Sequence, residues 1–170
     1  MDGIEKREII LDNYSHPFHK TSENVDGYIK VNSNNESCID NIDIYVLIKN
    51  GLLEDIKFDG EACAISTSST SIMIRNLIGK TEEEALEYIN NFEAMLNEEE
   101  YDGSSLNEAI VFDETYKQGN RKTCVTLPYV GLKKILEQHK EDQTNPLLIC
   151  LIRVLINQAF HIFHILIIEI

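Results

Sequence analysis

The feature that most constrains the fold is the pair Asn50-Gly51, which separates two apolar runs. The run before it, Ile42 to Ile48, is rich in Ile, Val and Tyr, and the run after it, Leu52 to Phe58, is apolar again. Asn-Gly in this setting is a strong hairpin signal because both turn positions need positive φ. An earlier run, Val25 to Val31, also has the pattern of a strand. Together the runs predict a small antiparallel sheet of about three strands.

The remaining patterns are helical, which predicts an α+β fold with several helices packed against the small sheet. Apolar residues at helical intervals predict a short amphipathic helix from Ile4 to Tyr14. Cys63 to Ile78 is predicted to be a buried helix whose Ser/Thr face lets a neighbour approach closely. A further helix, Thr81 to about Leu96, opens with the capping-box sequence Thr-Glu-Glu-Glu. A short helix or turn is expected between Leu106 and Lys117.

A last helix is predicted to begin near Leu127-Pro128, because proline suits the first turn of a helix. It is expected to end near His139. Residues 119–123 would then form a basic, turn-like approach to Cys124. The loop that delivers Cys38 is expected to begin at Asn32.

The chain is interpreted as one domain, residues 1–140, followed by an apolar C-terminal extension, residues 141–170, of unknown role. The extension is long enough to span a membrane, but it contains Arg153 and two histidines, which are costly in lipid. Membrane association is therefore the less favoured reading. The alternatives are a helix packed on the body of the protein, a partner surface, or a peculiarity of the reading frame.

Charge and cysteine content limit the possible partners, the expected location and the possible roles of the thiols. Against 15 basic residues the chain has 29 acidic ones, a formal net charge of −14, which repels phosphate backbones and makes nucleic acid an unsuitable partner. Met1 to Glu5 lack the basic stretch and apolar run of a secretory signal peptide, so we expect a cytoplasmic location. In that reducing compartment, the four cysteines indicate metal ligands or reactive thiols rather than a disulfide framework.

Three of the cysteines fall where a loop or a helix start would expose them: Cys38, Cys63 and Cys124. Cys150 instead lies in the apolar C-terminal segment and is interpreted as a small buried hydrophobe. Asp40, two residues after Cys38, adds a carboxylate to the same loop. Three thiolates and one carboxylate are a chemically complete donor set for tetrahedral Zn²⁺.

Local charge would favour thiolates at two of these positions. Cys63 lies at a helix N-terminus, and Arg121 and Lys122 precede Cys124. Around a dication, three thiolates and one carboxylate leave a charge of about −2, which nearby basic residues would offset. Arg121 and Lys122 are therefore candidates for supporting charge.

Spacing alone leaves other interpretations open. Without a Cys-x-x-Cys pair, the cysteines could be buried separately, each for structural reasons. Three histidines are either additional ligands or solvated and capping residues: His16, His19 and His139.

Five segments share one pattern with a known family. They are Ile10-Leu-Asp-Asn-Tyr-Ser-His-Pro17, Cys38-Ile-Asp40, Phe58-Asp-Gly-Glu-Ala-Cys-Ala-Ile-Ser66, Gly79-Lys-Thr-Glu-Glu-Glu-Ala85 and Arg121-Lys-Thr-Cys-Val-Thr-Leu127. In this order they resemble the U-type iron–sulfur cluster assembly scaffolds, the NifU N-terminal and IscU family, over about residues 4–139. The acidic stretch from Asn97 to Lys117 resembles the insertion that marks the SufU branch of that family.

The resemblance implies a SufE/NifU-like α+β fold that gathers Cys38, Asp40, Cys63 and Cys124 at one end, where they bind zinc. It also implies that Cys38 accepts persulfide sulfur from a cysteine desulfurase, as in a zinc-dependent sulfurtransferase. One alternative is a scaffold that assembles a transient [2Fe–2S] cluster on the three cysteines and transfers it to recipient apo iron–sulfur proteins. A second alternative is a structural zinc-binding interaction module.

Three positions depart from the family pattern. Ile39 and Ala62 stand where the family has glycine, and Ile39 is expected to restrict the backbone where the ligand loop turns. Thr123 stands where the IscU branch has His and the SufU branch usually has Lys. The missing His removes a possible fourth ligand and points away from IscU-type scaffolding.

Overall fold

The computed structural model describes residues 1–35 and 38–144, and the structural statements below concern those residues. The elements are, in order, α1 (Gly3–Ser15), β1 (Ile29–Asn34), β2 (Asn41–Lys49), β3 (Leu52–Glu61), α2 (Ala64–Leu77), α3 (Glu82–Leu96), the 3₁₀ helices η1 (Asn107–Phe112) and η2 (Thr115–Lys117), and α4 (Gly119–Thr144). The chain divides into two compact units, Met1–Ile135 and Leu136–Ile170. A domain boundary at residue 140 stays a prediction.

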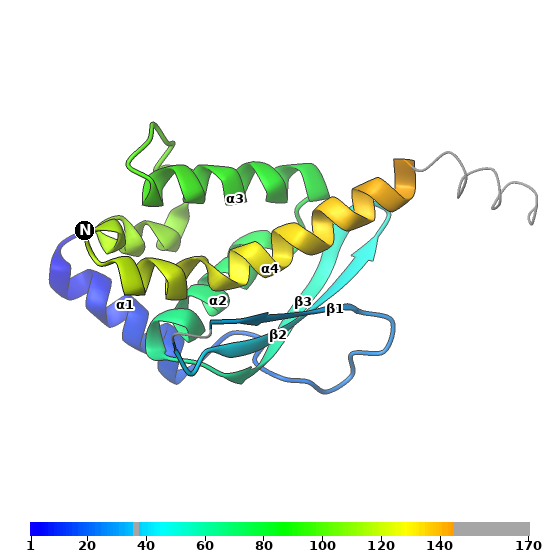
Figure 1. The fold of residues 1–170 in the computed structure, drawn as a ribbon, viewed down its shortest axis with the longest axis horizontal. Coiled ribbons are helices and arrows are strands. Elements are labelled where there is room, and N and C mark those ends of the chain that lie inside the picture. The colour runs from blue at the N-terminus through cyan, green and yellow to red at the C-terminus, as the bar shows by residue number, and fades with distance from the viewer. Residues whose placement is uncertain (36–37, 145–170) are drawn as a thin grey trace, which may run out of the picture. The chain divides into compact units, whose positions relative to one another are not determined.

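The strands form one antiparallel sheet in the order β1-β2-β3, which confirms the predicted α+β fold. Across the β2–β3 hairpin, Ile44 is opposite Phe58 and Val46 is opposite Ile56. All four side chains are buried, so they form one apolar face of the sheet. Helices α2 and α3 and residues 119–135 of α4 lie on the same side of this sheet (Figure 1). The hairpin turn at Asn50-Gly51 has positive φ at both residues, 52° and 74°, as predicted.

The first strand begins and ends later than predicted. Gly27 has a φ of 83°, and the Tyr28 backbone N–H closes a turn, so the chain becomes extended only at the next residue. Asn32, which the sequence placed in a loop, pairs with Asp43 of β2 in the ladder. Its side-chain amide also donates to the Asp43 carboxylate at 3.0 Å. The ligand loop is therefore shorter than expected and starts after Asn34.

Reciprocal caps begin two of the helices. Thr81 Oγ1 accepts the Glu84 backbone N–H at 3.1 Å, and the Glu84 carboxylate accepts the Thr81 N–H at 2.8 Å. This confirms the predicted capping box of α3. Asp2 and Glu5 form the same arrangement at the start of α1. Each cap supplies acceptors for backbone N–H groups that have no partner within the helix.

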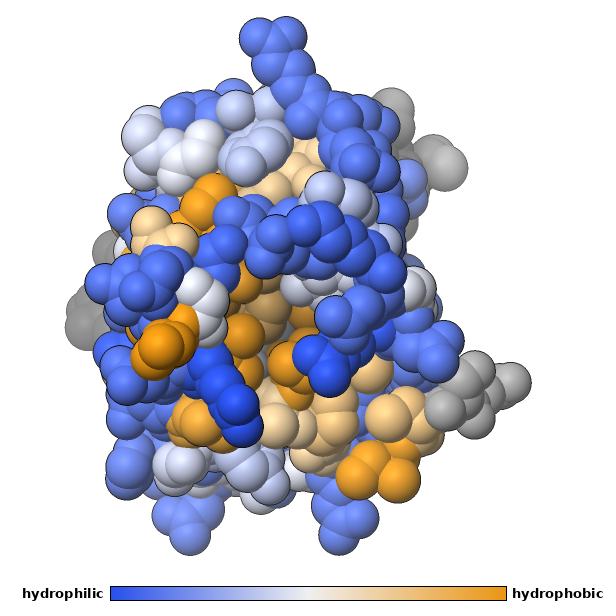
Figure 2. All heavy atoms as spheres, turned by 90° about the vertical axis from the view of Figure 1, so that its left-hand side faces the viewer, coloured by the Kyte–Doolittle hydropathy of each residue, from blue (hydrophilic) through white to orange (hydrophobic). Residues whose placement is uncertain are grey.

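Helix α1 presents three large apolar side chains to solvent, among charged ones. Ile4, Leu11 and Tyr14 are all exposed. Figure 2 shows apolar side chains among hydrophilic ones on the face of the molecule that carries this helix. The inward side packs on α2, where the Ser71 hydroxyl donates to the Asn13 side-chain oxygen at 2.7 Å.

The predicted start of the last helix near Leu127 is wrong. Helix α4 begins at Gly119, and Pro128 lies inside it. Residues 119–123, predicted to be a turn, form its first turns. Proline has no backbone N–H, so the carbonyl of Cys124, four residues earlier, lacks its helical donor.

Two serine hydroxyls of α2 lie at the interrupted part of α4. Ser66 Oγ is 3.1 Å from the Cys124 carbonyl oxygen, and Ser69 Oγ donates to the Val125 carbonyl oxygen at 2.7 Å. These contacts provide donors from a neighbouring helix where proline removes one. They explain why α4 continues through Pro128.

Close packing of α4 on the sheet depends on Gly131. A Cβ at this position would lie 2.2 Å from Ser33 Oγ and 3.1 Å from Ile44 Cδ1. With the neighbouring side chains as they stand, the absence of a side chain at Gly131 lets the helix approach β1 and β2 this closely. The position of α4 fixes the position of Cys124, which this helix carries.

Within the described part of the chain, no helix combines the length and the apolar character that crossing a membrane requires. The possible membrane association and the burial of Cys150 were predicted for residues outside that part.

Candidate metal centre

Four of the residues singled out from the sequence come together. Cys38, Asp40, Cys63 and Cys124 each offer one ligand atom, and these atoms all lie within 4.8 Å of one another. In a tetrahedral zinc site with Zn–S bonds of about 2.3 Å, two sulfurs are about 3.8 Å apart. Small side-chain movements would thus let all four atoms surround one ion. The donor set and its spacing fit zinc.

Asp40 is the most constrained member of the cluster. It is 1% exposed, and its Oδ1 accepts the Cys63 backbone N–H at 2.6 Å. Its Oδ2 accepts the Ser66 hydroxyl, also at 2.6 Å. Burial acts to raise the pKa of Asp40, but hydrogen bonds from Cys63, Ser66 and Cys124 outweigh it and lower that pKa below the ordinary value. Asp40 is therefore a carboxylate at neutral pH.

Cys63 is the N-cap residue of α2, as the sequence predicted. Its Sγ accepts the Ser66 backbone N–H at 3.4 Å and lies 3.7 Å from Asp40 Oδ2. A sulfur in this position faces the partial positive charge of the helix N-terminus, which favours negative charge. The local structure thus presents the Cys63 sulfur to a cation together with Asp40.

Cys124 was predicted to follow an exposed turn, but it lies inside α4 and is 7% exposed. Burial raises the pKa of the Cys124 thiol, and the neighbouring Asp40 carboxylate raises it further. The thiol therefore keeps its proton without a metal, and a bound cation would displace that proton. Lys122 Nζ donates to the Asn97 side chain at 2.7 Å, and Arg121 is exposed. Supporting charge from these two residues stays a prediction.

Cys38 differs from the other three because it is exposed, as the sequence predicted. It lies on the loop between β1 and β2, where its backbone N–H donates to the Asn35 carbonyl at 2.9 Å. The next residue, Ile39, is 71% exposed and is not one of the described residues with positive φ. The loop therefore turns without needing glycine at Ile39.

Two of the three histidines considered as ligands have other partners in the unit Met1–Ile135. His16 Nδ1 lies 3.2 Å from the Asp12 carboxylate, and His19 Nδ1 lies 2.9 Å from the Asp55 carboxylate. Neither belongs to the cluster of ligand atoms. His139 lies in the other unit, on the last turns of α4.

Sequence reasoning missed Ser66, which contacts three members of the cluster. The available signal was its place three residues after Cys63, where the backbone N–H of a helix meets the N-cap side chain. The Ser/Thr run was interpreted only as a small face. All six residues from Ser66 to Ser71 are buried, as that interpretation requires.

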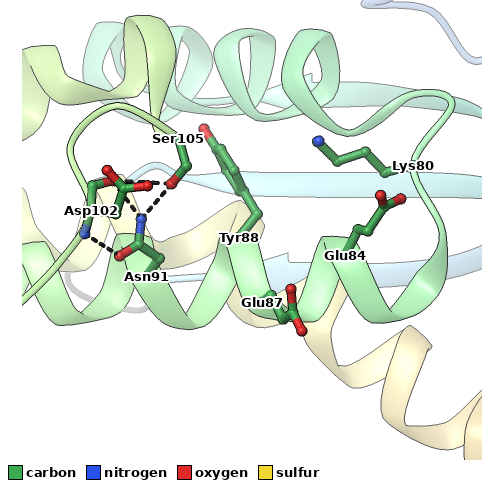
Figure 3. A pocket seen from close by; sticks show the side chains of 7 residues that line it. All are labelled: Lys80, Glu84, Glu87, Tyr88, Asn91, Asp102 and Ser105. Carbon is green, nitrogen blue, oxygen red and sulfur yellow. Dashed lines mark hydrogen bonds between the residues drawn. The ribbon is translucent and has the colours of Figure 1, made fainter.

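A pocket of about 320 Å³ lies away from the cluster, between α3 and the segment that follows it. Figure 3 shows Asn91 of α3 pointing toward Asp102 and Ser105. The Asn91 amide donates to the Asp102 carbonyl at 2.8 Å and to Ser105 Oγ at 2.7 Å, and its oxygen accepts the Asp102 N–H. These bonds hold the acidic segment against α3. The pocket therefore has a structural explanation, because it lies between α3 and a segment that these bonds hold in place.

Comparison with known proteins agrees with this geometry. Residues 5–124 match the NifU-like N terminal domain. The chain is 35% identical over 129 residues to the zinc-dependent sulfurtransferase SufU of Bacillus subtilis (strain 168), covering 75% of this chain and 86% of that protein. It is 34% identical over 141 residues to the iron-sulfur cluster assembly scaffold protein IscU of Streptococcus pyogenes serotype M1, covering 79% and 87%.

A solved structure is similar as well. It is the crystal structure of a putative iron-sulfur cluster assembly scaffold protein for the SUF system from Fervidobacterium islandicum AW-1. It superposes with a TM-score of 0.69 at 36% identity and covers 76% of this chain and 94% of that chain. Both sequence and fold thus confirm the resemblance, and the chain belongs to the NifU-like N-terminal domain family.

Proposed function

We propose that this protein is a SufU-type protein of iron–sulfur cluster assembly. It binds zinc through Cys38, Asp40, Cys63 and Cys124, and it accepts persulfide sulfur on Cys38 from a cysteine desulfurase. The observation that carries the proposal is the convergence of three sulfurs and one carboxylate oxygen within 4.8 Å.

The chemistry of the donor set supports zinc. Sulfur and carboxylate oxygen from four protein residues suit tetrahedral Zn²⁺. When bound, zinc would hold the cysteines as thiolates. Asp40 already carries its charge, because hydrogen bonds hold its pKa below the ordinary value. The buried Cys124 thiol is the group that most needs a cation to lose its proton.

Exposure distinguishes Cys38 as the sulfur acceptor. An incoming persulfide can reach an exposed thiolate, whereas Cys124 is buried. In the transfer, the Cys38 thiolate attacks the outer sulfur of the persulfide on the partner. A new S–S bond forms at Cys38, the S–S bond within the persulfide breaks, and the partner cysteine leaves as a thiolate. The proton of the persulfide stays on the transferred sulfur, so atoms and electrons balance.

The surface beside Cys38 supports a protein partner. Ile39 presents a large apolar side chain to solvent directly next to the acceptor. When a partner docks, it removes such an apolar side chain from water, and this burial favours association. We therefore propose that the desulfurase docks on this surface. The recipient apo proteins act in a later step.

Metal analysis tests the zinc site. Protein purified without added metal should contain about one equivalent of zinc, and Asp40→Ala should lose it or hold it only weakly. Thr123→Ala is the matched control, because it changes an exposed residue next to Cys124 and removes no proposed ligand. Iron in place of zinc, or full zinc retention in Asp40→Ala, would contradict the proposal.

Desulfurase stimulation tests the acceptor. Cys38→Ala should abolish stimulation of a cysteine desulfurase while circular dichroism shows an unchanged fold, because the substituted residue is exposed and on a loop. Retained stimulation would remove Cys38 from its proposed role.

The second candidate function is a scaffold that assembles a [2Fe–2S] cluster on the same cysteines. The similarity to the scaffold protein IscU of Streptococcus pyogenes favours it. Anaerobic reconstitution with iron and sulfide separates the two functions. A scaffold gains visible absorbance, whereas a zinc-dependent acceptor does not.

A further inference from the structure

We propose that Ser66 is a positioning residue that fixes three of the four ligand residues and leaves Cys38 as the one that exchanges. This inference rests on the zinc-binding function proposed above. Ser66 is not a ligand itself, but its contacts determine which ligand can leave the metal.

Ser66 touches each of the three ligand residues other than Cys38. Its hydroxyl oxygen lies 2.6 Å from Asp40 Oδ2, 3.5 Å from Cys63 Sγ and 3.1 Å from the Cys124 carbonyl oxygen. Its backbone N–H donates to Cys63 Sγ at 3.4 Å. The side chain is fully buried, at 0% exposure, so water does not compete for these contacts.

The single proton of the hydroxyl is shared between two acceptors, Asp40 Oδ2 and the Cys124 carbonyl oxygen, in a three-centre hydrogen bond whose stronger contact is the one with Asp40. That contact is the shortest, and its acceptor is charged, which makes the hydrogen bond stronger than one to a carbonyl. Asp40 Oδ1 is held independently by the Cys63 N–H. Each carboxylate oxygen has a second lone pair that remains available to a cation. The carboxylate is therefore fixed in orientation before any metal arrives, as hydrogen bonds to ligating carboxylates generally achieve.

The same residue links α2 to the third ligand. Pro128 leaves the Cys124 carbonyl without its helical donor, so this carbonyl can approach the Ser66 hydroxyl. The backbone that carries Cys124 is thereby held beside Asp40 and Cys63. One buried serine thus connects the β1–β2 loop, the N-terminus of α2 and the second turn of α4.

Cys38 lies outside this set of contacts. Among the described residues, the hydrogen bonds of Ser66 reach Asp40, Cys63 and Cys124, whereas Cys38 is exposed on its loop. Removing Cys38 from the metal disturbs none of the contacts that hold the other three ligands. The fixed set stays assembled while the Cys38 sulfur leaves and returns.

The test compares Ser66→Ala with Ser69→Ala. Ser69 is the matched control, because it lies one turn further along α2, is equally buried and donates to α4 at Val125 without touching a ligand residue. Competition titration against a zinc chelator should show zinc affinity reduced about 10–100-fold in Ser66→Ala. The affinity of Ser69→Ala should stay within about twofold of the original protein.

A second readout reports which ligand exchanges. Under saturating zinc, limited alkylation followed by mass spectrometry should label Cys38 first in the original protein and in Ser69→Ala. In Ser66→Ala, labelling should spread to Cys63 and Cys124. Ser66→Thr keeps the hydroxyl and should restore both the zinc affinity and the selectivity for Cys38.

Each outcome has a definite meaning. If Ser66→Ala behaves like Ser69→Ala, or if Ser66→Thr loses as much as Ser66→Ala, the positioning role is refuted while the zinc function stands. If the original protein binds no zinc, the proposed function itself fails, and the variants are not needed to show it.

Discussion

The contact between α4 and the sheet allows a prediction about Gly131→Ala. Whether this substitution lowers or raises the free energy of unfolding depends on one atom, Ser33 Oγ. Gly131→Ala would place a Cβ 2.2 Å from Ser33 Oγ and 3.1 Å from Ile44 Cδ1. Favourable contacts between carbon atoms are about 3.5–4.0 Å long. Either Ser33 must rotate or α4 must move away from β1 and β2.

Two effects of the substitution oppose each other. Alanine inside a helix is more favourable than glycine by about 1 kcal/mol, whereas overpacking a buried contact costs about 1–3 kcal/mol. Gly131→Ala should therefore lower the free energy of unfolding by up to about 2 kcal/mol. In a Ser33→Ala background the shortest contact is absent, and the contacts with Ile44 Cδ1 at 3.1 Å and Val31 Cγ1 at 3.4 Å remain. The same substitution should there be neutral or stabilising.

Urea denaturation of the metal-free protein and the three variants gives the coupling energy of the two positions. With a slope of about 2 kcal/mol/M, a loss of 1–2 kcal/mol moves the midpoint by about 0.5–1 M. Gly119→Ala is the control, because it lies at the start of the same helix with nothing within 4 Å of the new Cβ. An equal effect of Gly131→Ala in both backgrounds would refute the packing argument.

Three further predictions concern individual hydrogen bonds. Thr81→Ala removes the cap of α3 and should lower the free energy of unfolding by about 1 kcal/mol, visible as a lower urea midpoint. The Thr81 N–H lowers the pKa of Glu84, so the Glu84 contribution is present above about pH 4.3 and is lost as the pH falls. Glu84→Gln should therefore lose less free energy of unfolding than the original protein as the pH falls. An unchanged dependence of stability on acid pH would contradict this. Burial and a hydrogen bond to Asp55 raise the pKa of Tyr28 to about 12, so this contribution is lost as the pH rises from about 10 to 12. Tyr28→Phe should show a smaller alkaline loss in thermal melts than the exposed control Tyr14→Phe.

Elements with local signals could be predicted from the sequence. Asn50-Gly51 fixes a turn through its own backbone conformation, and Thr81 and Glu84 cap α3 through atoms only three residues apart. The placement of Cys63 at a helix start follows from the same kind of short-range pattern. Each of these features depends on energies that a few neighbouring residues determine, which is why sequence reasoning finds them.

The start of α4 could not be found in this way. Local rules place Pro128 in the first turn of a helix, and the structure places it in the interior. The donors at this part of α4 come from Ser66 and Ser69, which are 58 and 56 residues away from their acceptors along the chain. A proline that local rules treat as a boundary is thus accommodated by a neighbouring helix.

This long-range compensation also explains why Cys124 was placed on an exposed turn. The residues before it are basic and polar, which is typical of a loop, and only the packing of α2 against α4 shows that they begin a helix. The serine run has two consequences in the same place: it is small enough for α4 to approach, and its hydroxyls supply donors that Pro128 removes. Ser66 belongs to both the helix contact and the metal centre. A change there should therefore alter the helix contact and the ligand geometry together, whereas a change at Ser69 should alter only the contact.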